Sequence, residues 1–332
     1  MSHTAHVPYF WQTELWQRCH SWQQQQRLPH ALLLSGPAGL AKQVFAKHLI
    51  QSWICEQPNA TCEPCQQCRS CGWWQQENHP DVCLIQATEA TIPIAKVREL
   101  EAWLSLKPQH SVKRIGLILQ PQYMTRSASH ALLKTLEAPP AHGLFILVSD
   151  AKPLLLPTVR SRCVNLDFVC PTIAHSVNWL NSQYQYLPSD CEMALKYAYG
   201  APMRAKQDLD SGHMKQVAQC IGELLSAIEG KKSLPKLIEQ FIKLSAQSGL
   251  YYIYDCLKDL AWLVIGQTQA PVMHRHKLHT LQHMAHSLSG AQIVALLDQW
   301  HQLQYELLEF PGKNITLGLE SLLLNWQAAL KR

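Results

Sequence analysis

The sequence has few charged residues and no long apolar run, and each shortage excludes a class of protein. Charged residues make up 16% of the 332 positions and apolar residues 47%, which excludes an intrinsically disordered chain. No apolar run approaches the ~20 residues that span a bilayer, and the N-terminus lacks a basic-then-apolar signal pattern. The formal net charge of +5 is too small to argue for nucleic-acid binding by itself. We therefore expect a cytoplasmic protein without a membrane segment.

The first half of the chain alternates between short apolar runs and amphipathic segments. Runs typical of buried strands lie at 31–34, 82–86, 114–119, 144–148 and 164–168. Helical patterns lie at 13–26, 41–53, 94–106 and 127–136. Strands that alternate with helices indicate a mostly parallel sheet, so the fold class is α/β. After Pro171 the strand signals stop and helical periodicity continues to about residue 330. We predict an α/β domain at 1–168, a small helical lid at 169–208 and an all-α domain at 209–332.

The stretch SGPAGLAK at 35–42 follows the first predicted strand and almost spells an ATP-binding loop. That motif reads G-x-x-x-x-G-K-[ST], and Gly36 and Lys42 occupy the expected places. Ala41 replaces the second glycine, and Gln43 replaces the hydroxyl residue that ligates Mg²⁺. The backbone N–H groups at the start of the next helix, together with Lys42, remain a potential anion site. The alternative is a plain turn between a strand and a helix.

A cluster of cysteines follows the helix that begins after this loop. Its members, within 55–71, are Cys55, Cys62, Cys65, Cys68 and Cys71. Repeated C-x-x-C spacing lets thiolates converge on one ion, and this density indicates a metal site. The spacing is also similar to that of iron–sulfur proteins, but the C-P that usually follows is absent. A four-thiolate structural zinc site fits better, and the spacing alone leaves one of the cysteines spare.

The order of the motifs resembles a known family. After GPAGLAK and the cysteine run come HPD at 79–81, which we interpret as a turn, ALLKTLEAPP at 131–140 and PTVRSRC at 157–163. Over residues 1 to about 207 this order resembles the clamp-loader subunits of bacterial DNA polymerase III, within the AAA+ class. The remainder is similar only in position and helicity. The resemblance implies a P-loop-type AAA+ domain with a zinc knuckle, a helical lid and an oligomerising collar domain.

Some members of this family are motors, whereas its delta-prime branch has a decayed ATP site. An active AAA+ ATPase carries acidic residues after its third strand, one for Mg²⁺ and one for the attacking water. Gln120 and Pro121 stand at those positions here. The resemblance therefore implies a delta-prime type of subunit, without its own ATPase, in the DNA-directed DNA polymerase holoenzyme. Its expected partners are motor (gamma/tau) and delta subunits, the sliding clamp and primed DNA.

The resemblance also assigns roles to single residues. Gly36, Gly39 and Lys42 would form a degenerate loop with weak or no nucleotide binding and no functional Mg²⁺–ATP site. The structural zinc ligands that the delta-prime pattern selects are Cys55, Cys65, Cys68 and Cys71. Cys62 is then the spare.

Arg162, in the SRC sequence, would act in trans as an arginine finger on the γ-phosphate of ATP bound to a neighbouring subunit. Arg160 is a rival for this role, and a surface or intradomain salt bridge is the alternative for Arg162. Ser149 is similar to a polar sensor of γ-phosphate, but we expect it to cap a strand. Arg204 matches a second sensor or is a solvated helix arginine.

Two function classes compete with this interpretation. One is an autonomous P-loop ATPase with an unusual metal site, against which Gln120 and Pro121 argue. The other is a zinc- or iron–sulfur-dependent nucleic-acid-binding protein without motor partners. ATP hydrolysis by the lone chain would support the first class, and visible absorbance or tight DNA binding by the lone chain would support the second.

Overall fold

A computed structural model describes residues 8–87, 91–244, 246–266, 272–274, 277–309 and 315–331. The three predicted domains together span residues 1–332, and their other positions, which include residues 1–7, lie outside the described ranges. The chain divides into two compact units, residues 1–206 and 207–332. None of the helices within the described ranges combines the length and the apolarity needed to cross a membrane.

The first unit is built on a parallel sheet. Within the described residues its strands are β1 (Ala31–Ser35), β2 (Val82–Ile85), β3 (Arg114–Leu119), β4 (Gly143–Ser149) and β5 (Val164–Asp167). Their order is β2-β3-β4-β1-β5, and every neighbouring pair is parallel. The predicted parallel α/β sheet is therefore confirmed, with each strand found to within one residue of its expected ends. A parallel sheet gathers the carboxyl ends of all its strands along one edge, which is where ligands bind in such folds.

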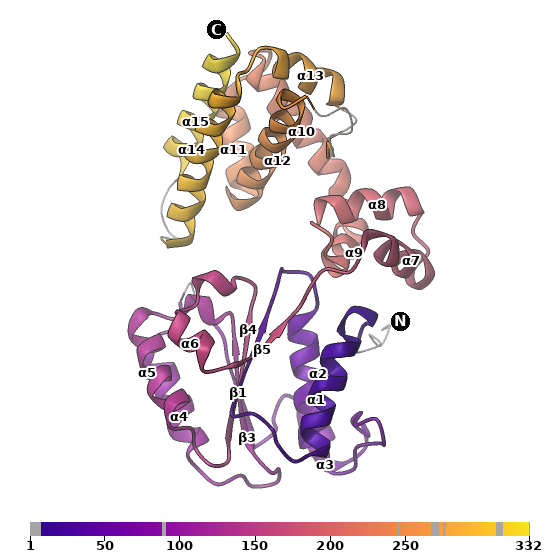
Figure 1. The fold of residues 1–332 in the computed structure, drawn as a ribbon, viewed down its shortest axis with the longest axis vertical. Helices are drawn as coiled ribbons and strands as arrows, with labels where there is room; N and C mark the ends of the chain where they lie inside the picture. Colours follow the sequence, from indigo (N-terminus) through magenta and orange to yellow (C-terminus); the bar gives the residue numbers. More distant parts are fainter. Residues whose placement is uncertain are drawn as a thin grey trace. The chain divides into compact units, whose positions relative to one another are not determined.

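Helices cover both faces of this sheet (Figure 1). They are α1 (Thr13–Gln24), α2 (Lys42–Ile54), α3 (Arg69–Gln75), α4 (Ile94–Leu104), α5 (Arg126–Glu137) and α6 (Pro157–Ser161), with single 3-10 turns η1 (Phe10–Gln12), η2 (Pro121–Tyr123) and η3 (Lys152–Leu154). Helices α1 and α2 lie on one face, and α4, α5 and α6 lie on the other (Figure 1). The wholly apolar strands explain this arrangement, because successive side chains point to opposite faces and both faces must be covered.

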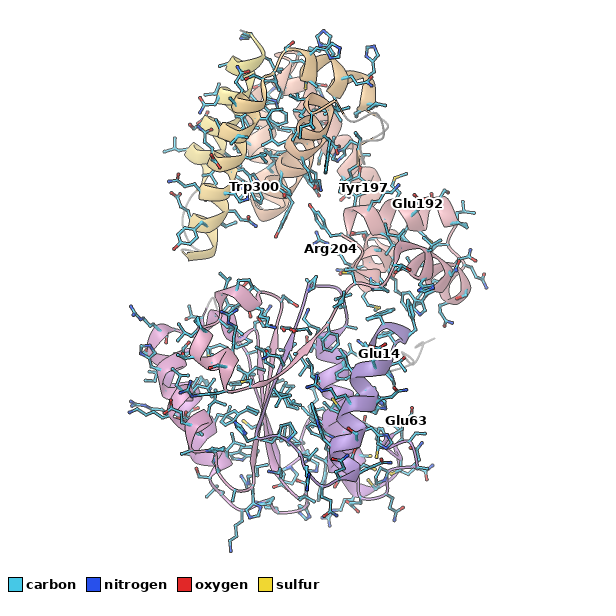
Figure 2. All side chains as sticks on the ribbon, viewed as in Figure 1. Glu14, Glu63, Glu192, Tyr197, Arg204 and Trp300 are labelled. Atoms are coloured by element: carbon cyan, nitrogen blue, oxygen red, sulfur yellow. The ribbon has the colours of Figure 1, made fainter. Side chains whose placement is uncertain are left out.

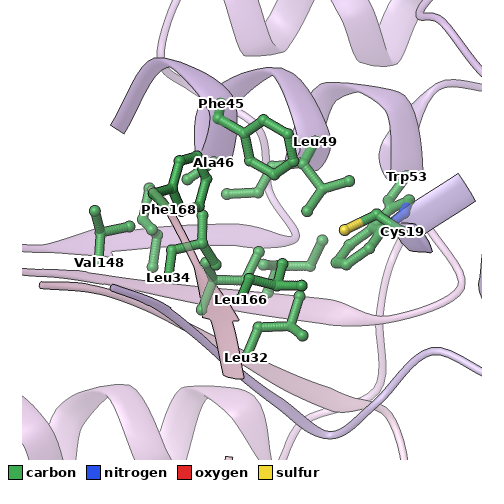
Figure 3. Close-up of a cluster of buried hydrophobic side chains, with 14 of the residues drawn as sticks. Cys19, Leu32, Leu34, Phe45, Ala46, Leu49, Trp53, Val148, Leu166 and Phe168 are labelled. Atoms are coloured by element: carbon green, nitrogen blue, oxygen red, sulfur yellow. The ribbon is translucent and has the colours of Figure 1, made fainter. Parts of the chain in front are cut away.

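Each face of the sheet has its own hydrophobic core. Leu32 and Leu34 of β1 pack with Phe45 and Leu49 of α2 on one face (Figure 3). Leu33, between them in the sequence, packs on the opposite face with residues of α4 and α5. All of these side chains are at most 1% exposed. Successive side chains of β1 thus pack into the cores on opposite faces of the sheet, and this packing fixes the end of the strand from which the following loop starts.

The rest of the chain is helical, as predicted. Helices α7 (Ile173–Tyr184), α8 (Pro188–Tyr197) and α9 (Pro202–Asp210) are followed by α10 (His213–Ile228), α11 (Leu234–Leu244), α12 (Ala246–Val264), α13 (Leu278–His286), α14 (Gly290–Glu309) and α15 (Thr316–Leu330). On α15 the buried residues are Leu319, Leu322, Leu323 and Trp326. This spacing of three and four residues makes one apolar face, which forms part of the core of the second unit. The predicted domain boundaries at residues 168 and 208 stay predictions.

Candidate functional site

The segment between β1 and α2 has the backbone shape of a phosphate loop. Ser35, the last residue of β1, is paired in register with Ser149, the last residue of β4. Ala41, immediately before α2, has φ 58° and ψ 31°, the left-handed conformation that favours glycine. Alanine therefore occupies the second glycine position of the motif although the backbone there keeps the glycine conformation.

Lys42 points back into its own loop. Its Nζ donates to the carbonyl oxygens of Gly36 at 2.7 Å and Pro37 at 2.5 Å, and it lies 2.5 Å from Oδ1 of Asp150. The Lys42 side chain is only 2% exposed, whereas that of Asp150 is 43% exposed. Three oxygens of the same chain thus surround the ammonium group that would otherwise contact a phosphate. The carboxylate among them would also repel an anion at this place.

The two glycines of the loop are required by close packing. A Cβ on Gly36, at φ 149°, would lie 2.3 Å from the carbonyl oxygen of Phe168. A Cβ on Gly39, at φ 81°, would lie 2.7 Å from Cβ of Arg204. The Gly39 carbonyl also accepts a hydrogen bond from the backbone N–H of Met203 at 3.1 Å. The loop is therefore held between β5 and the start of α9, and Arg204 is an exposed residue of that helix (Figure 2).

The end of β3 carries no acidic side chain. Gln120 is exposed and has a left-handed backbone at φ 54° and ψ 54°, and the buried Pro121 begins the turn η2. Ser149 Oγ donates to Oε1 of Gln122 at 2.9 Å and accepts from the N–H of Ala151 at 3.2 Å. Ser149 thus closes a turn after β4, as expected of a strand cap. Its hydroxyl is engaged with protein groups at the place where an active relative would read the γ-phosphate.

The sequence interpretation missed two acidic residues at this edge, Asp150 and Asp167. Asp150 pairs with Lys42, as described above. Asp167 accepts from Ser35 Oγ at 2.6 Å and from Lys152 Nζ at 2.6 Å, and Lys152 and then Ser35 lower the pKa of its carboxyl. Asp167 ends β5 and Asp150 directly follows β4, so an acidic residue at or just beyond the end of an apolar run is the signal that could have revealed them. Each carboxylate is already paired with a lysine.

The second candidate site lies at the other end of α2. The Sγ atoms of four cysteines all lie within 4.8 Å of one another, and these residues are Cys55, Cys65, Cys68 and Cys71. Cys55 caps the C-terminus of α2 and Cys68 caps the N-terminus of α3, so two helix ends bring the thiols together. The Sγ atoms of Cys55 and Cys68 are 3.9 Å apart. Cys62 does not belong to this group.

Backbone N–H groups surround the sulfurs of this knuckle, by which we mean residues 55–71. The N–H of Cys65 donates to the Cys55 sulfur at 3.3 Å, and the N–H of Cys68 donates to the Cys65 sulfur at 3.2 Å. The N–H groups of Gln67 and Cys68 lower the pKa of the Cys65 thiol to about 6. Burial raises the pKa of the Cys71 thiol, and a bound cation would favour its thiolate form. Four converging sulfurs with N–H support can hold a metal ion.

Polar and aromatic contacts anchor the knuckle to the first unit. Glu56 Oε1 accepts from the N–H of Ser70 at 3.1 Å and from its hydroxyl at 2.8 Å. The guanidinium of Arg69 lies 4.4 Å from the centre of the Trp73 ring, and the centre of the His110 imidazole ring lies 4.7 Å from it. Glu63 lies on the exposed loop of the knuckle (Figure 2). These contacts fix α3, and α3 fixes two of the four thiols.

The HPD residues form a turn before β2, as the sequence predicted. Asp81 is fully buried and accepts hydrogen bonds from the N–H groups of Gln109, His110 and Ser111 at 2.7 to 2.9 Å. Its carboxylate also lies 3.7 Å from Nε of Arg114. Asp81 therefore orders the loop that enters β3. His79 contributes Nδ1 as acceptor for the Asp81 N–H and lies outside the group of four cysteines.

The SRC segment lies at the end of α6. Arg162 caps this helix, and its Nη2 lies 2.6 Å from Oε1 of Glu137 while its Nη1 donates to the Thr158 carbonyl at 3.1 Å. In the isolated chain Arg162 thus forms the intradomain salt bridge that the sequence left as an alternative. Arg160 forms no ion pair with any described residue, and its buried Nε has no hydrogen-bond partner among them.

Sequence comparisons with known proteins point to one family. The family model "DNA polymerase III, delta subunit" matches residues 11–171, and the model of its C-terminal part matches residues 211–328. The DNA polymerase III subunit delta' of Pseudomonas aeruginosa is 29% identical, over 96% of this chain and 97% of that protein. The subunit delta' of Yersinia pestis is also 29% identical, over 91% and 90% of the two chains. A DNA polymerase III gamma subunit-related protein of Thermotoga maritima is 16% identical, with TM-score 0.41 over 94% of this chain and 99% of that one.

Proposed function

This chain belongs to the family of DNA polymerase III delta-prime subunits, which are clamp-loader subunits of DNA replication, and we propose that it acts in such a loader without hydrolysing ATP itself. It is the subunit of the complex that has no working ATP site. It assembles with motor (gamma/tau) and delta subunits into a complex that places the sliding clamp on primed DNA. Its Arg162 serves the ATP site of a neighbouring motor subunit.

The state of the phosphate loop supports the absence of hydrolysis. Lys42 is surrounded by two carbonyl oxygens and the Asp150 carboxylate, so no free cation faces the place of a phosphate. Gln120 and Pro121 offer neither a carboxylate for Mg²⁺ nor a base for water, both of which phosphoryl transfer requires. The loop serves as a packed connection between β1, β5 and α9. Engagement of the lysine within its own loop, absence of the metal ligand and absence of the base are three independent obstacles to catalysis.

The exposure of the SRC segment supports a role for Arg162 in trans. Its side chain is 35% exposed and its guanidinium is held by a surface carboxylate, so it can reach a second chain without unfolding of the first unit. A guanidinium binds phosphate oxygens through two parallel hydrogen bonds and keeps its charge at any physiological pH. Arginine fingers in other NTPases change rates by about 10³–10⁵. The loss in a loader with several ATP sites is smaller, because the other sites keep their own fingers.

The cysteine knuckle supports structural zinc. A tetrahedral zinc–thiolate site with Zn–S bonds of ~2.3 Å requires sulfurs about 3.8 Å apart. The Cys55–Cys68 separation of 3.9 Å and the mutual proximity of the four sulfurs fit that requirement. A shell closed by four protein ligands has no open position for a substrate, so the ion stabilises the fold and takes no part in ATP chemistry.

Reconstitution of the complete loader tests this function. The chain is combined with motor subunits, the delta subunit, the clamp and primed DNA, and steady-state ATP hydrolysis and clamp loading are measured. We expect the complex to need this chain for stimulated hydrolysis, while the chain alone hydrolyses no ATP.

Substitutions of Arg162 test its role in trans in the same complex. Arg162→Ala should lower the stimulated rate of ATP hydrolysis, and Arg162→Lys should restore little of it, since an ammonium group lacks the guanidinium fork. Arg160→Ala is the matched control and should have a smaller effect. Equal rates with Arg162→Ala and unmodified complexes would contradict the role in trans.

A further inference from the structure

Glu137, the last residue of α5, holds the Arg162 guanidinium at the surface of the first unit. Glu137 Oε1 lies 2.6 Å from Nη2, and the Thr158 carbonyl accepts from Nη1 at 3.1 Å. Both terminal nitrogens of the guanidinium therefore have a partner within the chain. The side chains of Glu137 and Arg162 are 55% and 35% exposed, so this ion pair lies where a neighbouring subunit can approach it.

The position of Glu137 is unfavourable for its own helix. The C-terminus of a helix carries partial negative charge, so an acidic side chain in the last turn is disfavoured there. Arg162, by contrast, caps the C-terminus of α6, where a cation is favoured. Helix α5 packs against α6 and thereby sets the distance between the two side chains. The carboxylate is thus explained by its contact with Arg162 and not by the stability of α5.

We infer that Glu137 is a positioning residue for Arg162, and this inference rests on the role in trans proposed above for that arginine. A free arginine side chain samples many rotamers, and this freedom is lost when its guanidinium binds a phosphate. Glu137 and Thr158 restrict the side chain before ATP of the neighbour approaches. The guanidinium has more N–H donors than these two contacts use, so it can bind γ-phosphate oxygens while Glu137 still holds it.

The exposure of the pair sets the size of the expected effect. Exposed ion pairs change an equilibrium by about 1.5- to fivefold. We therefore expect Glu137→Gln to lower the clamp- and DNA-stimulated kcat of the complete loader by at most about fivefold, and by less than Arg162→Ala does. The KM for ATP should stay unchanged, because Arg162 contributes in the transition state and not in ground-state binding.

A double-mutant cycle in the complete loader separates positioning from general damage. The variants are Glu137→Gln, Arg162→Ala and the two together. Glu77→Gln is the control, because Glu77 forms another exposed pair in the first unit, 3.1 Å from Lys47. We expect Glu137→Gln to lower kcat only when Arg162 is present and Glu77→Gln to change nothing. The inference is overturned if Glu137→Gln leaves kcat unchanged or raises it. It is also overturned if Glu137→Gln lowers kcat equally with Arg162 present and with Arg162→Ala. In either case Arg162→Ala alone would still lower the rate.

A measurement on the isolated full chain tests the contact without ATP hydrolysis. Phenylglyoxal modifies accessible arginines, and mass spectrometry of the digested chain locates the modified residue. Glu137→Gln should raise the modification rate of Arg162 and leave that of Arg160 unchanged. An unchanged rate at Arg162 would show that Glu137 does not hold it. If Arg162→Ala has no effect on the loader, both the role of Arg162 in trans and the positioning role of Glu137 are wrong. If Arg162→Ala lowers the rate and Glu137→Gln does not, only the positioning role is wrong.

Discussion

The phosphate loop and the cysteine knuckle lie at opposite ends of one helix, α2, and they differ in what satisfies their polar groups. At the start of α2, Lys42 is bound by oxygens of its own chain. At its end, Cys55 faces three other thiols. The loop is complete as it stands, whereas the knuckle brings together four groups that repel one another when ionised. In the loop the charged group is neutralised by protein atoms, whereas the four thiols of the knuckle are arranged as a metal ion would require.

This difference distinguishes the presence of motif residues from the contacts that their polar atoms make. The loop keeps Gly36, Gly39 and Lys42, yet each of these residues now has a role in packing or in an internal ion pair. The knuckle keeps its cysteines together with the N–H groups that support thiolates. Matching residues therefore indicate retained chemistry only where their polar atoms still face the ligand position. The comparison predicts opposite responses to substitution at the two ends of α2.

The largest effect is expected at the knuckle. Cys68→Ser should release the zinc and lower the free energy of unfolding of the first unit by several kcal/mol, because metal binding contributes directly to folding. Elemental analysis and thermal unfolding measure both changes on protein purified without metal-affinity steps. The unmodified chain should contain about one zinc and no iron. Cys62→Ser is the control and should change neither. Zinc loss with Cys62→Ser but not with Cys55→Ser would show that the ligand set is wrong.

A smaller effect is expected at the start of α2. Lys42→Ala leaves Asp150 and two loop carbonyls without their donor, so the free energy of unfolding should fall by about 1–3 kcal/mol. The proposed function assigns no catalytic role to the loop, so loader ATPase should stay nearly intact. Lys47→Ala, which removes only the exposed pair with Glu77 on the same helix, should cost less than about 1 kcal/mol. Denaturant unfolding of the three chains provides the comparison. A large loss of loader activity with assembly preserved would mean that Lys42 still acts on a phosphate.

The smallest effect is expected at Ala41. Glycine relieves a left-handed alanine by ~1–2 kcal/mol but adds about 0.5–1 kcal/mol of chain entropy to the unfolded state. Ala41→Gly should therefore raise the free energy of unfolding by about 0.5–1 kcal/mol, measured by denaturant unfolding. Ala38→Gly, in the same loop but without a positive φ, should lower it. If both substitutions destabilise the chain equally, the backbone at Ala41 does not carry the strain described above.

Periodicity and spacing predicted the strands and most of the thiol cluster but not the ion pairs. The apolar runs located every strand of the sheet, because buried parallel strands have few polar residues. The spare Cys62 could be chosen only from a family pattern, since local spacing treats it like its neighbours. The pairing of Asp150 with Lys42 and of Glu137 with Arg162 could not be predicted, because the partners are far apart in the sequence. Contacts of that kind depend on the order of the strands and on helix packing, which a one-dimensional pattern does not contain.

Gly36 has a consequence for how such chains evolve. A side chain at this position would collide with the Phe168 carbonyl, so purifying selection on packing alone is enough to preserve the glycine. Positions without such a neighbour, such as the exposed Gln43, are free to drift once ATP binding no longer matters. Descendants of an ATPase can thus keep the most recognisable letters of its motif long after the activity has gone. If the proposed function holds, genome surveys that count ATPases by those motif residues will also count proteins that hydrolyse no ATP.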